Sequence, residues 1–160
     1  MRGKWTWLVG IVLAVSLTGA VWAADNDNHT VTVTVSNINE IAVSGGNITL
    51  TINTATPGSD PDDATDATCG LGWTVNTTSK KIVVQTNQAS FDHTLKVVAT
   101  GVTGGSAAAE VTLTNSPQDF VTGVAETLGG CTLNYTAQVT AAQGTQSVDH
   151  TVTYTITASS

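Results

Sequence analysis

Alternation of threonine with apolar residues is the dominant pattern of this chain, and it occurs in near copies close to both ends. Residues 29–35 read HTVTVTV and residues 150–156 read HTVTYTI. A period of two places every apolar side chain on one face of a β-strand and every threonine on the other. Both segments are therefore predicted to be strands with one dry face and one wet face.

Similar short runs continue along the chain and are separated by glycine, proline and asparagine. Short strands separated by such turn-forming residues are typical of a sandwich or barrel, and no stretch shows a helical period. The sequence predicts an all-β fold, a single immunoglobulin-like antiparallel β-sandwich of about eight or nine strands over residues 24–160. The expected strands are Thr30–Val35, Glu40–Ser44, Asn47–Asn53, Cys69–Val75, Lys81–Thr86, Thr94–Thr100, Glu110–Thr114, Cys131–Thr140 and Ser147–Ala158.

The first 23 residues have the composition of a secretory signal peptide. Arg2 and Lys4 give a basic start, an apolar run follows, and Val21-Trp22-Ala23 fits a cleavage site. The apolar run of about 14 residues is shorter than the roughly 20 needed to span a bilayer. We therefore expect a secreted protein, located outside the cell, on its surface or in a periplasm, with no membrane segment after cleavage.

Charge narrows the range of partners. Without the first 23 residues, Lys80, Lys81 and Lys96 stand against twelve carboxylates, which gives a net charge of −9. Such a surface repels nucleic acid and anionic lipid, and neither is expected as a partner.

Cys69 and Cys131 are the two cysteines of the sequence. An even number in an exported chain favours one disulfide, and a bond closing so long a loop is predicted to stabilise the fold by roughly 4 kcal/mol. Trp73 and Tyr135 each follow a cysteine by four positions. These matching offsets predict that the two strands face each other or run side by side. The alternative is a pair of buried free thiols.

Each of the three histidines stands directly before a predicted strand. The motifs are Asn28-His29-Thr30, Asp92-His93-Thr94 and Asp149-His150-Thr151. By parity each imidazole lies at the rim of the core. If the first and last strands run parallel, His29 and His150 share a rim and are candidates for a copper or zinc site. The alternative is a turn residue that shields the edge of the core.

The longest predicted loop, residues 54–66, is rich in carboxylates. Its four aspartates are candidates for calcium, because Ca²⁺ takes oxygen ligands from flexible loops. Pro61 interrupts the spacing of an EF-hand loop, and a solvated loop of turn formers is the alternative. The candidates are Asp60, Asp62, Asp63 and Asp66.

Catalytic chemistry is not expected. No Gly-x-Ser-x-Gly motif occurs, and Asp92 and Asp149 neighbour their histidines in sequence, so their side chains point to opposite faces. No cofactor is predicted, and the protein is expected not to be an enzyme.

Three segments carry a resemblance to known proteins: residues 31–46 (VTVTVSNINEIAVSGG), residues 73–82 (WTVNTTSKKI) and residues 151–157 (TVTYTIT). They resemble uncharacterised secreted bacterial proteins, threonine-rich β-sandwiches of surface and fimbrial-subunit type. The resemblance implies a non-enzymatic structural role and transfers no catalytic residue. Fimbrial subunits often carry an early disulfide, whereas Cys69 and Cys131 are central and late.

Two functions follow as hypotheses. The first is a structural or cell-surface protein, a fibre or matrix subunit whose partner is another copy of itself or another surface protein. A segment such as 29–35 can add as a strand to the sheet of a neighbour, which builds open polymers. The alternative is an extracellular module that binds carbohydrate or protein through the predicted loops 54–66 and 115–129.

Overall fold

The computed structural model describes residue 26 and residues 28–159. The chain divides into two compact units, one ending at Thr34 and the other beginning at Val35. The strands of the described residues all lie in the second unit, and the predicted signal peptide lies outside the described part of the chain. Among the described residues, no helix has the length and apolar character needed to cross a membrane.

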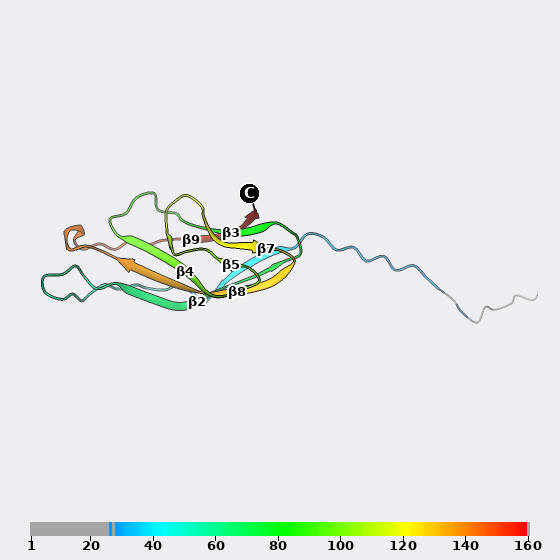
Figure 1. Ribbon diagram of the computed structural model, residues 1–160, viewed down its shortest axis with the longest axis horizontal. Coiled ribbons are helices and arrows are strands. Elements are labelled where there is room, and N and C mark those ends of the chain that lie inside the picture. Colours follow the sequence, from blue (N-terminus) through cyan, green and yellow to red (C-terminus); the bar gives the residue numbers. More distant parts are fainter. Residues whose placement is uncertain (1–25, 27, 160) are drawn as a thin grey trace, which may run out of the picture. The chain divides into compact units, whose positions relative to one another are not determined.

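The second unit is a sandwich of two antiparallel sheets, whose strands form two layers in Figure 1. The five-stranded sheet has the order β1 (Asn39–Ser44), β2 (Ala64–Val75), β8 (Thr127–Gln138), β4 (Thr94–Thr103) and β6 (Val111–Thr112). The four-stranded sheet has the order β5 (Ser106–Ala107), β7 (Gln118–Val124), β3 (Lys80–Thr86) and β9 (Val152–Ala158). The predicted all-β sandwich is confirmed, while the immunoglobulin-like strand order stays a prediction.

The core lies between the sheets and is built from alternate residues of each strand, as a period of two requires. Burying a side chain such as valine or leucine contributes about 1.5–3 kcal/mol, so this layer holds the sandwich together. From the five-stranded sheet come Leu71, Trp73, Val75, Leu95, Val97, Leu133 and Tyr135, and from the other sheet Ile82, Val84, Phe120, Val121, Val124 and Tyr154.

Strand β7 is the main element that the sequence does not predict. It occupies Gln118–Val124, inside the region expected to be the loop 115–129. Phe120 and Val121 are adjacent and both fully buried, and the pairing of β3 with β7 shifts register beside them. A bulge of this kind breaks the alternation that identifies a strand. The prediction of a long loop here is wrong.

Two predicted strands are absent from the described chain. Residues 30–35 form no strand, and Val31, Val33 and Val35 are 71%, 79% and 74% exposed, so their assignment to the dry face is wrong. Residues 47–53 also form no strand, although Ile48, Leu50 and Ile52 pack against the core as expected. Alternation predicts which face is dry, but a strand also needs a hydrogen-bonded neighbour.

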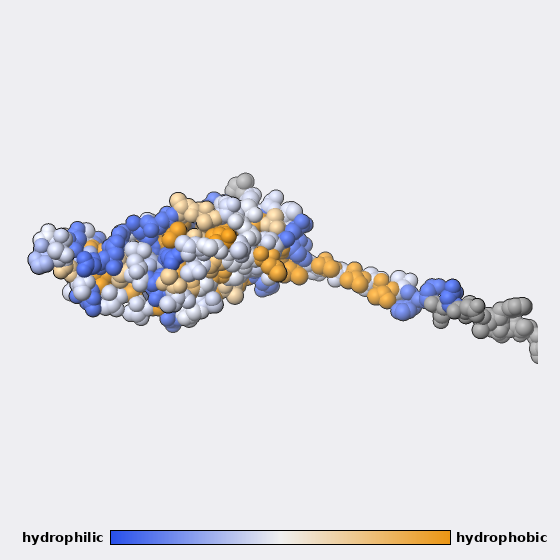
Figure 2. All heavy atoms as spheres, turned by 60° about the horizontal axis from the view of Figure 1, so that its bottom comes forward, coloured by the Kyte–Doolittle hydropathy of each residue, from blue (hydrophilic) through white to orange (hydrophobic). Residues whose placement is uncertain are grey.

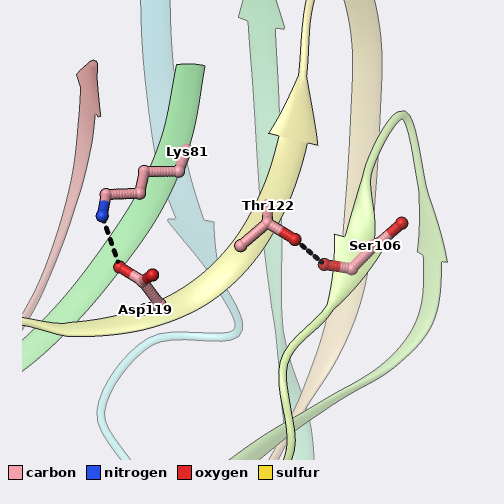
Figure 3. A network of polar contacts seen from close by, with 4 residues as sticks. All are labelled: Lys81, Ser106, Asp119 and Thr122. Carbon is pink, nitrogen blue, oxygen red and sulfur yellow. Dashed lines mark hydrogen bonds and ion pairs between the residues drawn. The ribbon is translucent and has the colours of Figure 1, made fainter. Parts of the chain in front are cut away.

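The outer face of the four-stranded sheet carries polar contacts between neighbouring strands (Figure 3). Lys81 Nζ of β3 lies 2.8 Å from Asp119 Oδ1 of β7. The hydroxyl of Thr122 on β7 donates to the carbonyl of Ser106 on β5 at 3.5 Å. An ion pair near the surface contributes at most about 1 kcal/mol, so these contacts add little to the stability of the sandwich.

Candidate functional site

The segment before the sandwich is the first candidate surface. Within the described part of the chain, residues 29–35 form no hydrogen bond, and their valines are exposed. Hydrophobic side chains recur at intervals along this extended segment in Figure 2. The segment therefore has the alternation of a strand without the partner of one.

Asn76 fixes the chain where this segment ends. Its Oδ1 accepts from the Ile38 amide at 2.6 Å, and its Nδ2 donates to the Ser36 carbonyl at 2.8 Å. The Asn76 amide donates to the Ile38 carbonyl at 3.1 Å. Hydrogen bonds thus hold residues 36–38 against Asn76, as in a short strand pairing. The three exposed valines lie directly before this held stretch in the sequence.

Two of the four sheet edges are long enough to receive another strand. Strands β5 and β6 have two residues each, whereas the edge strands β1 and β9 have six and seven. On β9, the inward-facing Val152 and Ile156 are only partly buried. An edge strand of this length presents a row of unpaired amides and carbonyls.

Residues 47–53 present a second set of unpaired backbone groups. Ile48, Leu50 and Ile52 pack against the same core as Val152 and Ile156. Across the described chain, this segment makes no hydrogen bond. Its apolar side chains are thus placed as in a strand while its backbone lacks a strand partner.

The histidines form a second candidate site, with a different pairing from the predicted one. His93 precedes β4 in one sheet and His150 precedes β9 in the other, and their Nε2 atoms lie 2.8 Å apart. The sequence-based candidate pair was His29 with His150, but the partner of His150 is His93. The shared Asp-His-Thr motif marked both positions, and only the strand directions bring them to the same end of the sandwich.

Each imidazole of this pair also has a partner at its other nitrogen. His93 Nδ1 lies 2.9 Å from Gln146 Oε1, and His150 Nδ1 lies 3.0 Å from Thr86 Oγ1. With the Gln146 oxygen facing His93, the neutral tautomers are assigned from the contacts. His93 donates from Nδ1 to Gln146, His150 donates from Nε2 to His93, and the Thr86 hydroxyl donates to His150 Nδ1.

An aromatic ring holds both imidazoles in place. Phe91 packs edge-on against His150 with ring centroids 4.7 Å apart, and lies 4.8 Å from His93 at a tilt of 40°. Burial lowers the pKa of His150, the charge of a protonated His93 lowers it further, and Asp149 opposes both effects. The neutral form of His150 is therefore favoured, and the Nε2 lone pair of His93 faces a nitrogen donor.

Three of the four carboxylates of the predicted calcium loop accept hydrogen bonds from within the chain, and Asp62 is the exception among them. Asp60 Oδ1 accepts from the Ala141 amide at 2.9 Å, and Asp63 Oδ2 accepts from Gln138 Nε2 at 2.6 Å. Asp66 accepts from the amide and hydroxyl of Thr68, which lowers its pKa. Nowhere in residues 28–159 do three histidine, cysteine or acidic groups gather around a point that could hold a metal ion.

A shallow hollow of about 300 Å³ lies beside this loop and bears on the predicted binding module. Asp60 and Asp63 line it together with Thr94, Gln138 and Gln143. Both aspartates are already paired within the chain, and the second predicted loop contains β7. The region that could form a loop-based binding surface is therefore smaller than the sequence predicts.

The two cysteines are free thiols, so the predicted disulfide is absent. Strands β2 and β8 do run side by side, as the matching aromatic offsets predict. Cys131 lies opposite Leu71 and Cys69 lies opposite Leu133, two residues out of register. Diagonal neighbours stand about 7–8 Å apart, beyond the Cα spacing of about 5.5–6 Å that is usual for a disulfide.

The cysteines have separate packing roles instead. Cys69 is buried, and its thiol donates to the Gly46 carbonyl at 3.5 Å. Burial raises the pKa of Cys131, with the Leu71 backbone opposing the shift, so its reactive thiolate form is disfavoured.

Comparisons with known proteins assign no function to the candidate sites, so these sites are interpreted from their residues alone. No protein-family model matches the chain, and no curated protein matches it significantly.

Proposed function

We propose that this protein is a non-enzymatic, exported structural subunit that assembles with copies of itself by β-strand addition. Residues 29–35 of one copy add beside the β9 edge of the next copy. The observation that supports this proposal most directly is the exposure of Val31, Val33 and Val35 in an otherwise strand-like segment. Exposed apolar side chains in a row mark surfaces that are covered by a partner.

The two surfaces match in their side-chain pattern. The added segment carries a valine at every second position, and β9 carries Val152, Tyr154 and Ile156 on its inner side. An added strand in register with β9 directs its valines toward the same core. Each valine buried in this way contributes about 1.5–3 kcal/mol, which favours association over an exposed segment.

The backbone groups also match. The outer side of β9 and the segment 47–53 both lack strand partners within residues 28–159. An incoming strand supplies amides and carbonyls to such groups, as in other complexes formed by strand addition. Because the donor segment and the acceptor edge are different parts of the sequence, the contact between copies is head to tail and can continue into a fibre.

The threonine-rich wet faces are consistent with an extracellular fibre or a bacterial surface layer. Threonine favours extended backbone and presents a hydroxyl to water. The negative charge keeps subunits from associating through faces other than the added strand.

The matched variants Val33→Asp and Thr32→Asp test assembly. Both place the same charge in the same segment, but on opposite sides of the added strand. Val33→Asp is expected to abolish the growth of oligomers measured by light scattering and electron microscopy, because a carboxylate would enter the neighbour's core. Thr32→Asp is expected to leave assembly largely intact.

Neither substitution is expected to change the melting temperature of the monomer, since both side chains are exposed. A wild-type protein that stays monomeric at all concentrations would overturn the proposal. Equal behaviour of the two variants would do the same. If residues 29–35 instead pair with β9 of their own copy, their amide protection from hydrogen exchange will not depend on concentration.

A further inference from the structure

We propose that His93 and His150 form a binding site for a divalent transition-metal ion, with copper(II) preferred. The ion would be bound by the two Nε2 atoms, which lie 2.8 Å apart where the starts of β4 and β9 meet. Imidazole nitrogen is a preferred ligand of copper, nickel and zinc. This site is independent of strand addition, because it uses neither residues 29–35 nor the outer edge of β9.

The remaining ring nitrogens lie next to the oxygen partners that metal-binding histidines use. Ligating imidazoles donate their second N–H to an oxygen, which fixes the tautomer and aims the lone pair at the metal. Here Gln146 Oε1 lies 2.9 Å from His93 Nδ1, and Thr86 Oγ1 lies 3.0 Å from His150 Nδ1. His93 Nδ1 already donates to Gln146, and His150 Nδ1 can donate to Thr86 Oγ1 once its proton has moved there, which leaves both Nε2 atoms for the ion.

Binding requires a proton to move but none to be released. In the metal-free pair, His150 carries its proton on Nε2 and donates it to His93. When the ion binds, this proton is carried on Nδ1 instead and is donated to Thr86. The Thr86 hydroxyl then turns toward Asn87 Oδ1, which lies 3.4 Å away, so every donor keeps an acceptor.

The ligand type favours copper over zinc. The affinity of a nitrogen site for divalent first-row metals rises to Cu²⁺ and falls again at Zn²⁺. The 2.8 Å between the two Nε2 atoms is the length of the hydrogen bond from His150 to His93 in the metal-free pair. Ion binding replaces this hydrogen bond, and the rings turn so that both lone pairs meet at an ion about 2.0 Å from each nitrogen.

The rigidity and charge of the surroundings support binding. Phe91 packs against both rings, and the two histidines stay partly exposed, so water can fill the remaining coordination positions. The negative charge of the chain raises the local concentration of cations.

Titration of the purified protein with copper(II) sulfate at neutral pH tests the site. Calorimetry is expected to give one high-affinity ion per chain, and electron paramagnetic resonance an axial spectrum with coupling to two imidazole nitrogens. Zinc and nickel are expected to bind more weakly. A wild-type spectrum with coupling to fewer than two imidazoles would overturn the proposal without any variant.

Variants distinguish this site from adventitious binding. His93→Ala and His150→Ala are expected to abolish the high-affinity phase, while His29→Ala serves as the matched control and is expected to retain it. Gln146 is exposed, so Gln146→Ala will fold, and loss of its positioning bond is expected to weaken binding roughly 10-fold. Unchanged affinity in His93→Ala and Gln146→Ala, or loss of affinity only in His29→Ala, would overturn the proposal.

Discussion

At the scale of single residues, Gly129 has the least room for a side chain of the described glycines, because Trp73 packs on it. The two residues lie opposite each other on β2 and β8. A methyl group added to Gly129 would come within 2.2 Å of the indole ring. The indole is 3% exposed, and no residue in the described chain accepts a hydrogen bond from its Nε1. The ring is therefore held by contacts alone, and glycine is needed opposite it.

Gly129→Ala is expected to destabilise the fold by about 1–3 kcal/mol, because the ring and the backbone must both shift. Gly72→Ala is the matched control, since an added methyl group there meets nothing within 4 Å. Urea denaturation followed by tryptophan fluorescence measures both. Equal stability of the two variants would show that the indole can move at little cost.

At the scale of elements, the sequence predicts extended segments better than it predicts their partners. Strands β1 and β3 match predicted strands closely, β9 lies within a predicted strand, and β2, β4 and β8 overlap predicted strands and extend beyond them, β2 and β8 into the predicted loops. The agreement arises because a period of two is kept wherever a regular sheet has one dry face. The same period occurs in residues 30–35 and 47–53, which are not paired. The alternation of residue types reflects which face of the segment is buried. Backbone pairing with a neighbouring strand depends on residues far away in the sequence, which no local pattern identifies.

The candidate histidine site illustrates the same limit. The sequence marks His150 as a candidate at the rim of the core, because its parity matches the apolar residues of the following strand. It cannot identify His93 as the partner, since that contact joins residues 57 positions apart on different sheets. The bulge that hides β7 has a similar origin, because two adjacent buried residues resemble no regular strand.

Asn76 provides a test of how residues 36–38 are held at the start of the sandwich. Asn76→Ala removes the side-chain bonds to Ser36 and Ile38, each contributing about 0.5–1.5 kcal/mol. The Ile38 amide is expected to exchange its hydrogen faster, while core amides of β3 and β8 keep their protection. Asn47→Ala, whose side chain forms no hydrogen bond in the described chain, is the control and should leave the Ile38 amide unchanged. Faster exchange throughout the sandwich would mean that Asn76 supports the whole fold.

At the scale of the whole molecule, a pair of tyrosines joins the two sheets. Tyr135 of β8 and Tyr154 of β9 are buried, and their hydroxyls lie 2.9 Å apart. Burial raises the pKa of both phenols above the ordinary value of 10.0. For Tyr154 the charge and hydrogen bond of Tyr135 raise the pKa further, and for Tyr135 the hydrogen bond partly opposes the shift. The native fold therefore stabilises the neutral, protonated form of both phenols.

This pair predicts how stability depends on alkaline pH. Below pH 10 both phenols are neutral in the folded and unfolded chains, and the native stability is complete. Above pH 10 the unfolded chain loses these protons and the folded chain keeps them, so stability falls as the pH rises. The sequence contains only these two tyrosines. Absorbance at 295 nm is expected to rise only together with unfolding measured by circular dichroism, and a rise in the folded protein would contradict the burial of the pair.

The positions of the lysines have a consequence for proteolysis. Residues 24–160 contain no arginine, and their three lysines are Lys80 and Lys81 in β3 and Lys96 in β4. Trypsin-like enzymes cut after these residue types and need several residues of free backbone around the bond. Here every such bond is part of a hydrogen-bonded ladder, and the exposed N-terminal segment offers none. The folded chain is therefore expected to resist trypsin-like proteases, although this part of the sequence contains three lysines after which they cut unfolded chains.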